Sequence, residues 1–199
     1  GAGKVTAEWM INGEVNEDVF SLDISRFEKF HSETNFIIDR AAESLGNQYA
    51  MHWPYKQKKT SRNIKTFPYH DLLKKEGACF GQVAGFESPL WYAIDGEKPE
   101  FKYSFGYQNW YKSAQNETIN TRKNVGFFEL TPFAKFEIEG EAAYSSLQYL
   151  CSNDIKNNDG AITYTQMLNS KGGIEADLSV TCISKNKFRI ITGSGVREH

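Results

Sequence analysis

The spacing of hydrophobic residues in the first part of the chain predicts two helices with an extended segment between them. Residues 5–12 place apolar side chains at helical spacing before Gly13, which favours a helix with a glycine C-cap. Apolar and polar residues then alternate over 20–24, a pattern typical of a short strand or extended arm. A second amphipathic pattern predicts a helix over 34–45 that ends at Gly46.

The hydrophobic periodicity disappears in the next segment and then returns. Residues 49–66 are rich in polar and aromatic side chains without a period, which predicts a loop or linker and a domain boundary near Thr66. Pro68 stands where a helix can begin, and Gly77 stands where it can end. We expect a strand over 78–84 directly after that helix.

An aromatic-rich segment without clear periodicity covers residues 86–111. Its tryptophans, tyrosines and phenylalanines fit either a satellite of the hydrophobic core or a cage around a flat ligand, and the pattern leaves both readings open. A short helix is expected over 117–124, and Gly126 then leads into a pair of phenylalanines.

The last third of the chain combines one strand–helix unit with a meander. Alternation predicts a strand over 135–139, and apolar residues at helical spacing predict a helix over 143–151. Three further strands, separated by glycine- and asparagine-containing turns, are expected over 161–168, 174–184 and 188–192. The fold class predicted is α+β, with mixed or antiparallel sheets and flanking helices.

Composition and charge narrow the class of protein. The 199 residues include 40% hydrophobic, 24% charged and 14% aromatic side chains, as in soluble globular proteins, and the formal net charge is −2. This charge gives no basic surface for nucleic acid, and the lysine cluster 56–59 is interpreted as a solvated loop. No apolar stretch approaches the roughly 20 residues that span a bilayer, and no signal peptide is evident. We therefore expect a cytoplasmic protein without a membrane partner.

The cysteines and histidines offer little metal or redox chemistry. Cys79, Cys151 and Cys182 lie far apart in apolar surroundings, which predicts reduced, buried thiols. The four histidines show no ligand spacing such as H-E-x-x-H, so no metal site is predicted.

The segment from Tyr164 to Val180 contains the most informative pattern in the chain. Two glycines, Gly172 and Gly173, mark a tight hairpin turn, and an acidic residue, Asp177, follows within the next strand. Period-two alternation turns Asp177 away from the face that its apolar neighbours share. A carboxylate inside a strand needs water or a partner, so it fits both a solvated surface residue and a functional group.

This hairpin resembles the L-N-E-x-G-G-I-x-x-D-L-x-V motif of the aminomethyltransferase family, which includes the glycine cleavage T-protein and the C-terminal parts of dimethylglycine and sarcosine dehydrogenases. The resemblance implies that Asp177 contacts the pterin of tetrahydrofolate and is catalytic. A carboxylate at that place can orient the pterin and handle a proton. The same resemblance suggests that further residues line the pterin, although turn geometry alone equally explains the glycines: Tyr164, Met167, Asn169, Gly172, Gly173 and Ile174.

Two earlier blocks resemble the same family. Residues 67–81, with 85–93, are similar to its opening helix and strand, and residues 125–140 resemble its next block. Glu129 stands where the family usually has Asp, and Ser170 stands where it usually has Glu. Both departures leave Asp177 in place and bear on the affinity for folate.

The residues before Phe67 separate the candidate relatives. Residues 1–24 resemble the C-terminal end of a flavin domain, and 25–66 resemble the linking domain of dimethylglycine and sarcosine dehydrogenases. Residues 67–199 would then be the N-terminal part of a folate-binding domain. No G-x-G-x-x-G sequence is present to hold FAD. The chain is therefore expected to be an inactive fragment of a longer enzyme, although a tag remnant also explains its first residue.

The resemblance implies a parent that oxidises a small N-methyl amine with FAD and transfers the one-carbon unit to tetrahydrofolate. Which amine it uses, and its oligomeric state, stay open. Two alternatives also remain. One is a T-protein-like aminomethyltransferase without a flavin half, and the other is a non-catalytic folate-binding or scaffold module.

Overall fold

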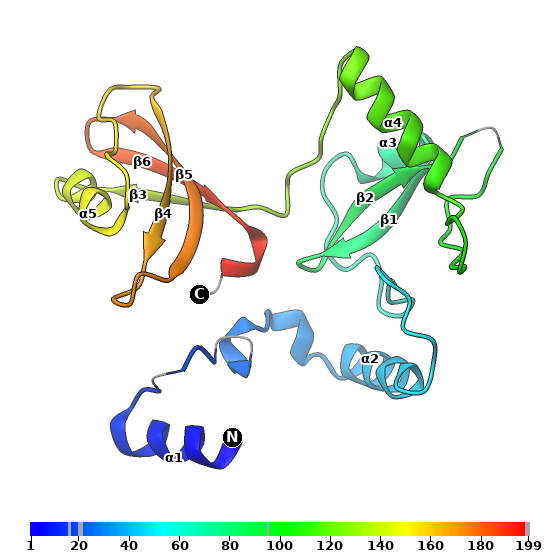
Figure 1. Ribbon diagram of the computed structural model, residues 1–199, viewed down its shortest axis with the longest axis horizontal. Helices are drawn as coiled ribbons and strands as arrows, with labels where there is room; N and C mark the ends of the chain where they lie inside the picture. The colour runs from blue at the N-terminus through cyan, green and yellow to red at the C-terminus, as the bar shows by residue number, and fades with distance from the viewer. Residues whose placement is uncertain (16, 20–21, 95, 198–199) are drawn as a thin grey trace.

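The computed structural model describes residues 1–15, 17–19, 22–94 and 96–197. The N-terminal part contains two α-helices, α1 (Ala2–Asn12) and α2 (Thr34–Asn47), with the 3-10 helices η2 (Ile24–Arg26) and η3 (Lys29–Ser32) between them (Figure 1). Neither α1 nor α2 contains a buried residue. These two helices therefore contribute no buried side chain to a hydrophobic core.

Both predicted N-terminal helices are confirmed, with changes at their edges. Gly13 ends α1 in the left-handed conformation, with φ of 77°, as its C-cap role requires. Gly46, which was expected to end α2, lies inside the helix, and Gln48 is its C-cap. The short strand or extended arm expected over 20–24 is wrong at Ile24, which begins η2, whereas residues 20–21 lie outside the described residues.

The middle of the chain forms a two-stranded antiparallel sheet with two helices. It comprises α3 (His70–Lys75), β1 (Ala78–Val83), β2 (Phe86–Tyr92) and α4 (Tyr111–Lys123). The helix α4 packs along β2, as Figure 1 shows. The predicted helix after Pro68 and the predicted strand after Gly77 are both confirmed.

Two expectations for the middle of the chain are wrong. Residues 86–92 are not irregular, because they form β2 and pair with β1 over its whole length. Pro89 lies within this strand, opposite Phe80, where the ladder is irregular, and a two-stranded sheet tolerates proline at such an edge. The helix expected over 117–124 begins six residues earlier, at Tyr111. Its start was missed because the first turns of the helix are mostly polar and show no apolar period.

The C-terminal part is a four-stranded antiparallel sheet with one helix. It contains β3 (Ala134–Glu139), α5 (Ala143–Leu150), β4 (Ile162–Leu168), β5 (Ile174–Ser184) and β6 (Lys187–Thr192), followed by η4 (Ser194–Val196). The strand order is β3-β6-β5-β4, so the first strand pairs with the last. All four predicted strands and the predicted helix are confirmed, with ends within a residue or two.

The main hydrophobic core lies between α5 and one face of this sheet (Figure 1). Leu147 of α5 packs there with Val180 and Cys182 of β5 and Phe188 of β6, all of which are almost completely buried. Burying each large apolar side chain contributes roughly 1.5–3 kcal/mol. On the opposite face of the sheet, Asp177 of β5 is exposed.

The three cysteines are free and buried, as predicted. Burial raises the pKa of the Cys79 thiol to about 11, so this thiol stays protonated at neutral pH. The cysteines therefore act as core residues.

Candidate functional site

The β4–β5 hairpin determines which way its side chains point. Antiparallel pairing sets Gln166 opposite Asp177 and Tyr164 opposite Ser179. Alternation sends Leu178 and its apolar neighbours into the α5 core, whereas Asp177 is exposed. The predicted outward orientation of Asp177 is thus what the structure shows.

Three side chains meet on the outer face of this hairpin. The Gln166 amide donates a hydrogen bond from Nε2 to Oδ1 of Asp177 at 3.1 Å. Hydrogen bonding to the Asp177 carboxylate, with smaller contributions from burial and the carboxylate's charge, raises the pKa of the Tyr164 phenol. The Gln166 amide therefore holds the carboxylate from the neighbouring strand while the carboxylate stays open to solvent.

The turn between the two strands is organised by Asn169. Its Oδ1 accepts hydrogen bonds from the backbone N–H of Lys171 at 3.0 Å and of Gly173 at 2.8 Å. Gly172 has φ of +80°, and a Cβ on Gly173 would lie 2.8 Å from the Asn169 amide nitrogen. Turn geometry therefore accounts for both glycines without a ligand.

The structure does not bring all the predicted lining residues together. Met167 points to the other face of β4, where it packs against the α5 core. Ile174 begins β5 with 68% of its surface exposed, near the turn. Tyr164 and Asp177 remain adjacent, and Gln166 joins them. Sequence reasoning missed Gln166, although its position two residues after Tyr164 on one strand was a usable signal.

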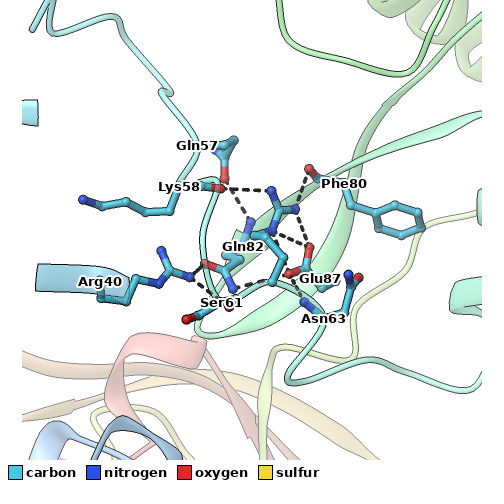
Figure 2. A network of polar contacts seen from close by, with 9 residues as sticks. Arg40, Gln57, Lys58, Ser61, Asn63, Phe80, Gln82 and Glu87 are labelled. Atoms are coloured by element: carbon cyan, nitrogen blue, oxygen red, sulfur yellow. Dashed lines mark hydrogen bonds and ion pairs between the residues drawn. The ribbon is translucent and has the colours of Figure 1, made fainter. Parts of the chain in front are cut away.

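A second polar cluster lies where the segment before α3 meets the β1–β2 hairpin (Figure 2). Glu87 of β2 is completely buried, and its carboxylate forms an ion pair with the Arg62 guanidinium. The Arg62 Nε lies 2.8 Å and 3.0 Å from the two carboxylate oxygens, and the backbone N–H of Asn63 donates to Oε1 at 2.8 Å. The Arg62 guanidinium also donates to the Phe80 carbonyl at 2.9 Å.

This cluster is structural. Both oxygens of Glu87 already accept hydrogen bonds, so the buried carboxylate has no exposed edge for a substrate. Burial opposes the charge of Glu87, but the hydrogen bonds from Arg62 and Asn63 and the nearby positive charge together outweigh burial and keep the pKa of this carboxyl below its ordinary value. Sequence reasoning missed the pair because its partners come from segments predicted to be irregular.

Helix α2 is joined to the same segment. Arg40 of α2 donates to the Ser61 carbonyl and to the Gln82 side chain of β1 (Figure 2). Glu43 of α2 accepts hydrogen bonds from the backbone N–H groups of residues 59 and 60 and from the Thr60 hydroxyl. Burial opposes ionisation of Glu43, but these hydrogen bonds lower its pKa to about 2.

Metal and membrane features are not found in the described part of the chain. No group of three or more His, Cys, Asp or Glu side chains among residues 1–15, 17–19, 22–94 and 96–197 could hold a metal ion. Within the same residues, no helix is both long and apolar enough to cross a bilayer.

Comparison with known families gives the class of the protein. The family model described as "GCVT N-terminal domain" matches residues 69–199, more than half of the chain, and the chain belongs to this family. A second family model, "FAD dependent oxidoreductase central domain", matches residues 12–66. The predicted relationship to flavin- and folate-type enzymes is thus confirmed.

Three curated relatives align with nearly the whole chain. It is 39% identical over 98% of its length to 4-methylaminobutanoate oxidase (formaldehyde-forming) of Paenarthrobacter nicotinovorans. It is 33% identical to the mitochondrial pyruvate dehydrogenase phosphatase regulatory subunit of Mus musculus and 30% identical to the mitochondrial dimethylglycine dehydrogenase of Rattus norvegicus, each over 100% of its length. The chain spans about a quarter of these relatives, covering 24%, 23% and 23% of their lengths.

A solved structure supports the fold. The chain is similar to the glycine cleavage system aminomethyltransferase T from Bartonella henselae, with a TM-score of 0.51 and 26% identity. The match covers 67% of this chain and 32% of that one. The predicted α+β class, with antiparallel sheets and flanking helices, is confirmed.

Proposed function

We propose that this chain is part of a longer enzyme that oxidises an N-methyl amine with FAD and transfers the one-carbon unit to tetrahydrofolate. The two family matches and the dehydrogenase and oxidase relatives support this function. In this proposal residues 1–24 end a flavin domain, 25–66 form a linking domain and 67–199 begin the folate-binding domain. The observation that carries the proposal is the exposed carboxylate of Asp177, held in place on an open sheet face.

The residues around Asp177 fit a reduced pterin. An ionised carboxylate accepts parallel N–H bonds from a planar donor pair, which the pterin ring provides. Tyr164, with 61% of its surface exposed, lies beside Asp177 and offers an aromatic ring for a flat ligand. In the proposed site Asn169, Gly172, Gly173 and Ile174 form the rim at the turn, and Met167 supports β4 from the core side.

The proposed chemistry follows from this geometry. Tetrahydrofolate supplies the amine that takes up the one-carbon unit. The Asp177 carboxylate would hold the ring through hydrogen bonds to its oxygens and would accept the N–H proton that this amine loses as its new C–N bond forms, which is general base catalysis by a positioned group. Because the chain has no G-x-G-x-x-G sequence, we assign no flavin chemistry to its residues.

The test is Asp177→Asn in the full-length enzyme, with flavin reduction and methylene-tetrahydrofolate production followed in parallel. We expect unchanged flavin reduction and a loss of about 10²-fold or more in one-carbon transfer, which is the usual contribution of a general base. The matched control is Asp154→Asn, an exposed carboxylate that accepts a hydrogen bond from Gln148 outside the site. Transfer at the wild-type rate in Asp177→Asn would rule out the assigned role.

A second candidate function is a non-catalytic regulatory module. It is favoured by one observation, the 33% identity with a relative named as a phosphatase regulatory subunit. The two functions differ in ligand binding, because a scaffold has no need for a folate site. Titration of the full-length protein with tetrahydrofolate separates them: saturable binding supports the enzyme, and its absence supports the scaffold.

The flavin-free aminomethyltransferase is the weaker alternative. Residues 12–66 match a central domain of FAD-dependent oxidoreductases, which such a protein would not need. A colourless full-length protein would reverse this preference.

A further inference from the structure

Gln166 lies beside the Asp177 carboxylate, and the proposed mechanism gives it no role. Its amide nitrogen donates to Oδ1 of Asp177 at 3.1 Å across the β4–β5 ladder. The two residues are direct cross-strand partners, so their Cβ atoms lie roughly 4.5–5.5 Å apart and the contact needs no unusual side-chain conformation.

The backbone around Gln166 is also held at the edge of β4 that faces away from β5. The segment after α5 lies along β4, where the Ser152 N–H donates to the Gln166 carbonyl at 2.9 Å. The Asn153 N–H donates to the Thr165 hydroxyl at 3.1 Å, and Cys151 forms a bridge with Met167. Gln166 is therefore presented from a strand that is bound on both sides.

We propose that Gln166 is a positioning residue, which holds the Asp177 carboxylate in the orientation needed for the folate reaction. This inference rests on the proposed function and names a further residue of that site. Its amide bonds Oδ1 of Asp177, and an ionised carboxylate keeps further acceptor sites on its two oxygens for the N–H groups of a ligand. A preorganised carboxylate does not have to be reoriented during the reaction, which is how a supporting residue contributes to rate.

The charged groups on this face have partners other than Asp177, so the neutral Gln166 amide is the group that bonds its carboxylate. Arg189 and Lys187 of β6 lie further along the same face, and both form ion pairs with Glu137 of β3, at 2.7 Å and 3.0 Å. Glu175 precedes Asp177 on the same face and accepts a hydrogen bond from Asn169 at 2.7 Å. Among the described hydrogen bonds, the Gln166 amide is thus the donor to the Asp177 side chain.

The test combines Gln166→Met with Asp177→Asn in the full-length enzyme. Methionine keeps the length of the side chain and removes the N–H donor. We expect one-carbon transfer to slow roughly ten-fold in kcat, the typical worth of one hydrogen bond, with flavin reduction unchanged. If Gln166 acts through Asp177, the double variant will be no slower than Asp177→Asn alone.

A spectroscopic reading tests the contact directly. Gln166 lowers the pKa of the Tyr164 phenol and Asp177 raises it, so Gln166→Met should raise this pKa further. The measurement is ¹³Cζ-tyrosine NMR, with the Tyr164 resonance assigned by Tyr164→Phe. The control is Gln148→Met, which removes a glutamine–aspartate hydrogen bond, 2.9 Å long, from α5 to Asp154, together with the bond that Gln148 accepts from the Ile155 N–H. It should leave both transfer and the Tyr164 resonance unchanged.

The outcomes distinguish this inference from the proposed function. Slowed transfer in Asp177→Asn with unaffected transfer in Gln166→Met overturns the positioning role and keeps the function. Additive losses in the double variant also overturn it. Normal transfer in Asp177→Asn overturns the proposed function itself, and with it the role of Gln166.

Discussion

The Arg62 guanidinium and the Glu87 carboxylate form a buried ion pair between the segment that precedes α3 and strand β2. Further hydrogen bonds hold each partner. Arg62 donates to the carbonyls of Lys58 and Phe80, and Glu87 accepts from the N–H of Asn63. The segment near the proposed domain boundary is thus fixed to the first sheet of the GCVT-type region.

Removing one partner of this pair should destabilise the protein strongly. Arg62→Ala leaves the Glu87 carboxylate buried without its counter-charge, and such a change typically costs about 3–5 kcal/mol. Urea unfolding measures the loss. The matched control is Arg189→Ala, which removes an exposed pair with Glu137 and should cost less than about 1 kcal/mol. Equal losses in the two variants would contradict the structural role of Arg62.

Acid should destabilise the contact between α2 and residues 59–60. The pKa of Glu43 falls from an ordinary value of 4.5 to about 2 on folding. A carboxyl whose folded-state pKa is lowered contributes stability above its unfolded pKa and loses it as the pH falls through the folded value. We therefore expect this contribution to disappear between pH 4.5 and about 2.

The check for this prediction compares wild type with Glu43→Gln in urea unfolding across that pH range. The free energy of unfolding of the variant should be lower than that of wild type above pH 4.5, and the difference should vanish near pH 2. A difference between the two proteins that does not change with pH would contradict the assignment.

The hairpin turn should tolerate substitution poorly at Gly172. Its φ of +80° is unfavourable for any residue with a Cβ, so Gly172→Ala should cost roughly 1–2 kcal/mol. Gly195→Ala is the control, because Gly195 has open space and no positive φ. Thermal unfolding measures both, and a melting temperature lowered equally in the two variants would argue against strain at Gly172.

The C-terminal half was predictable from sequence because its signals are local. Alternation around Leu178 and the glycines of the turn set the hairpin, and the same alternation turned Asp177 outward. The strand β2 was missed because Glu87 and Pro89 interrupt its apolar pattern, and Glu87 is acceptable there only because Arg62 neutralises it.

The side-chain partnerships were beyond local patterns. Pairing Arg62 with Glu87 requires knowing how a loop lies against a strand 25 residues away. Pairing Gln166 with Asp177 requires the register of the hairpin, which an irregularity near Leu168 shifts. A one-residue slip would have turned Gln166 to the opposite face of the sheet.

The proposed site holds a reduced pterin against Asp177 on the outer face of the β4–β5 hairpin. Its most direct measurement is ¹³Cζ-tyrosine NMR of Tyr164 in the full-length protein during titration with tetrahydrofolate. We expect a saturable shift of the Tyr164 resonance that is lost in Asp177→Asn. Saturable folate binding that leaves the Tyr164 resonance unmoved would contradict it.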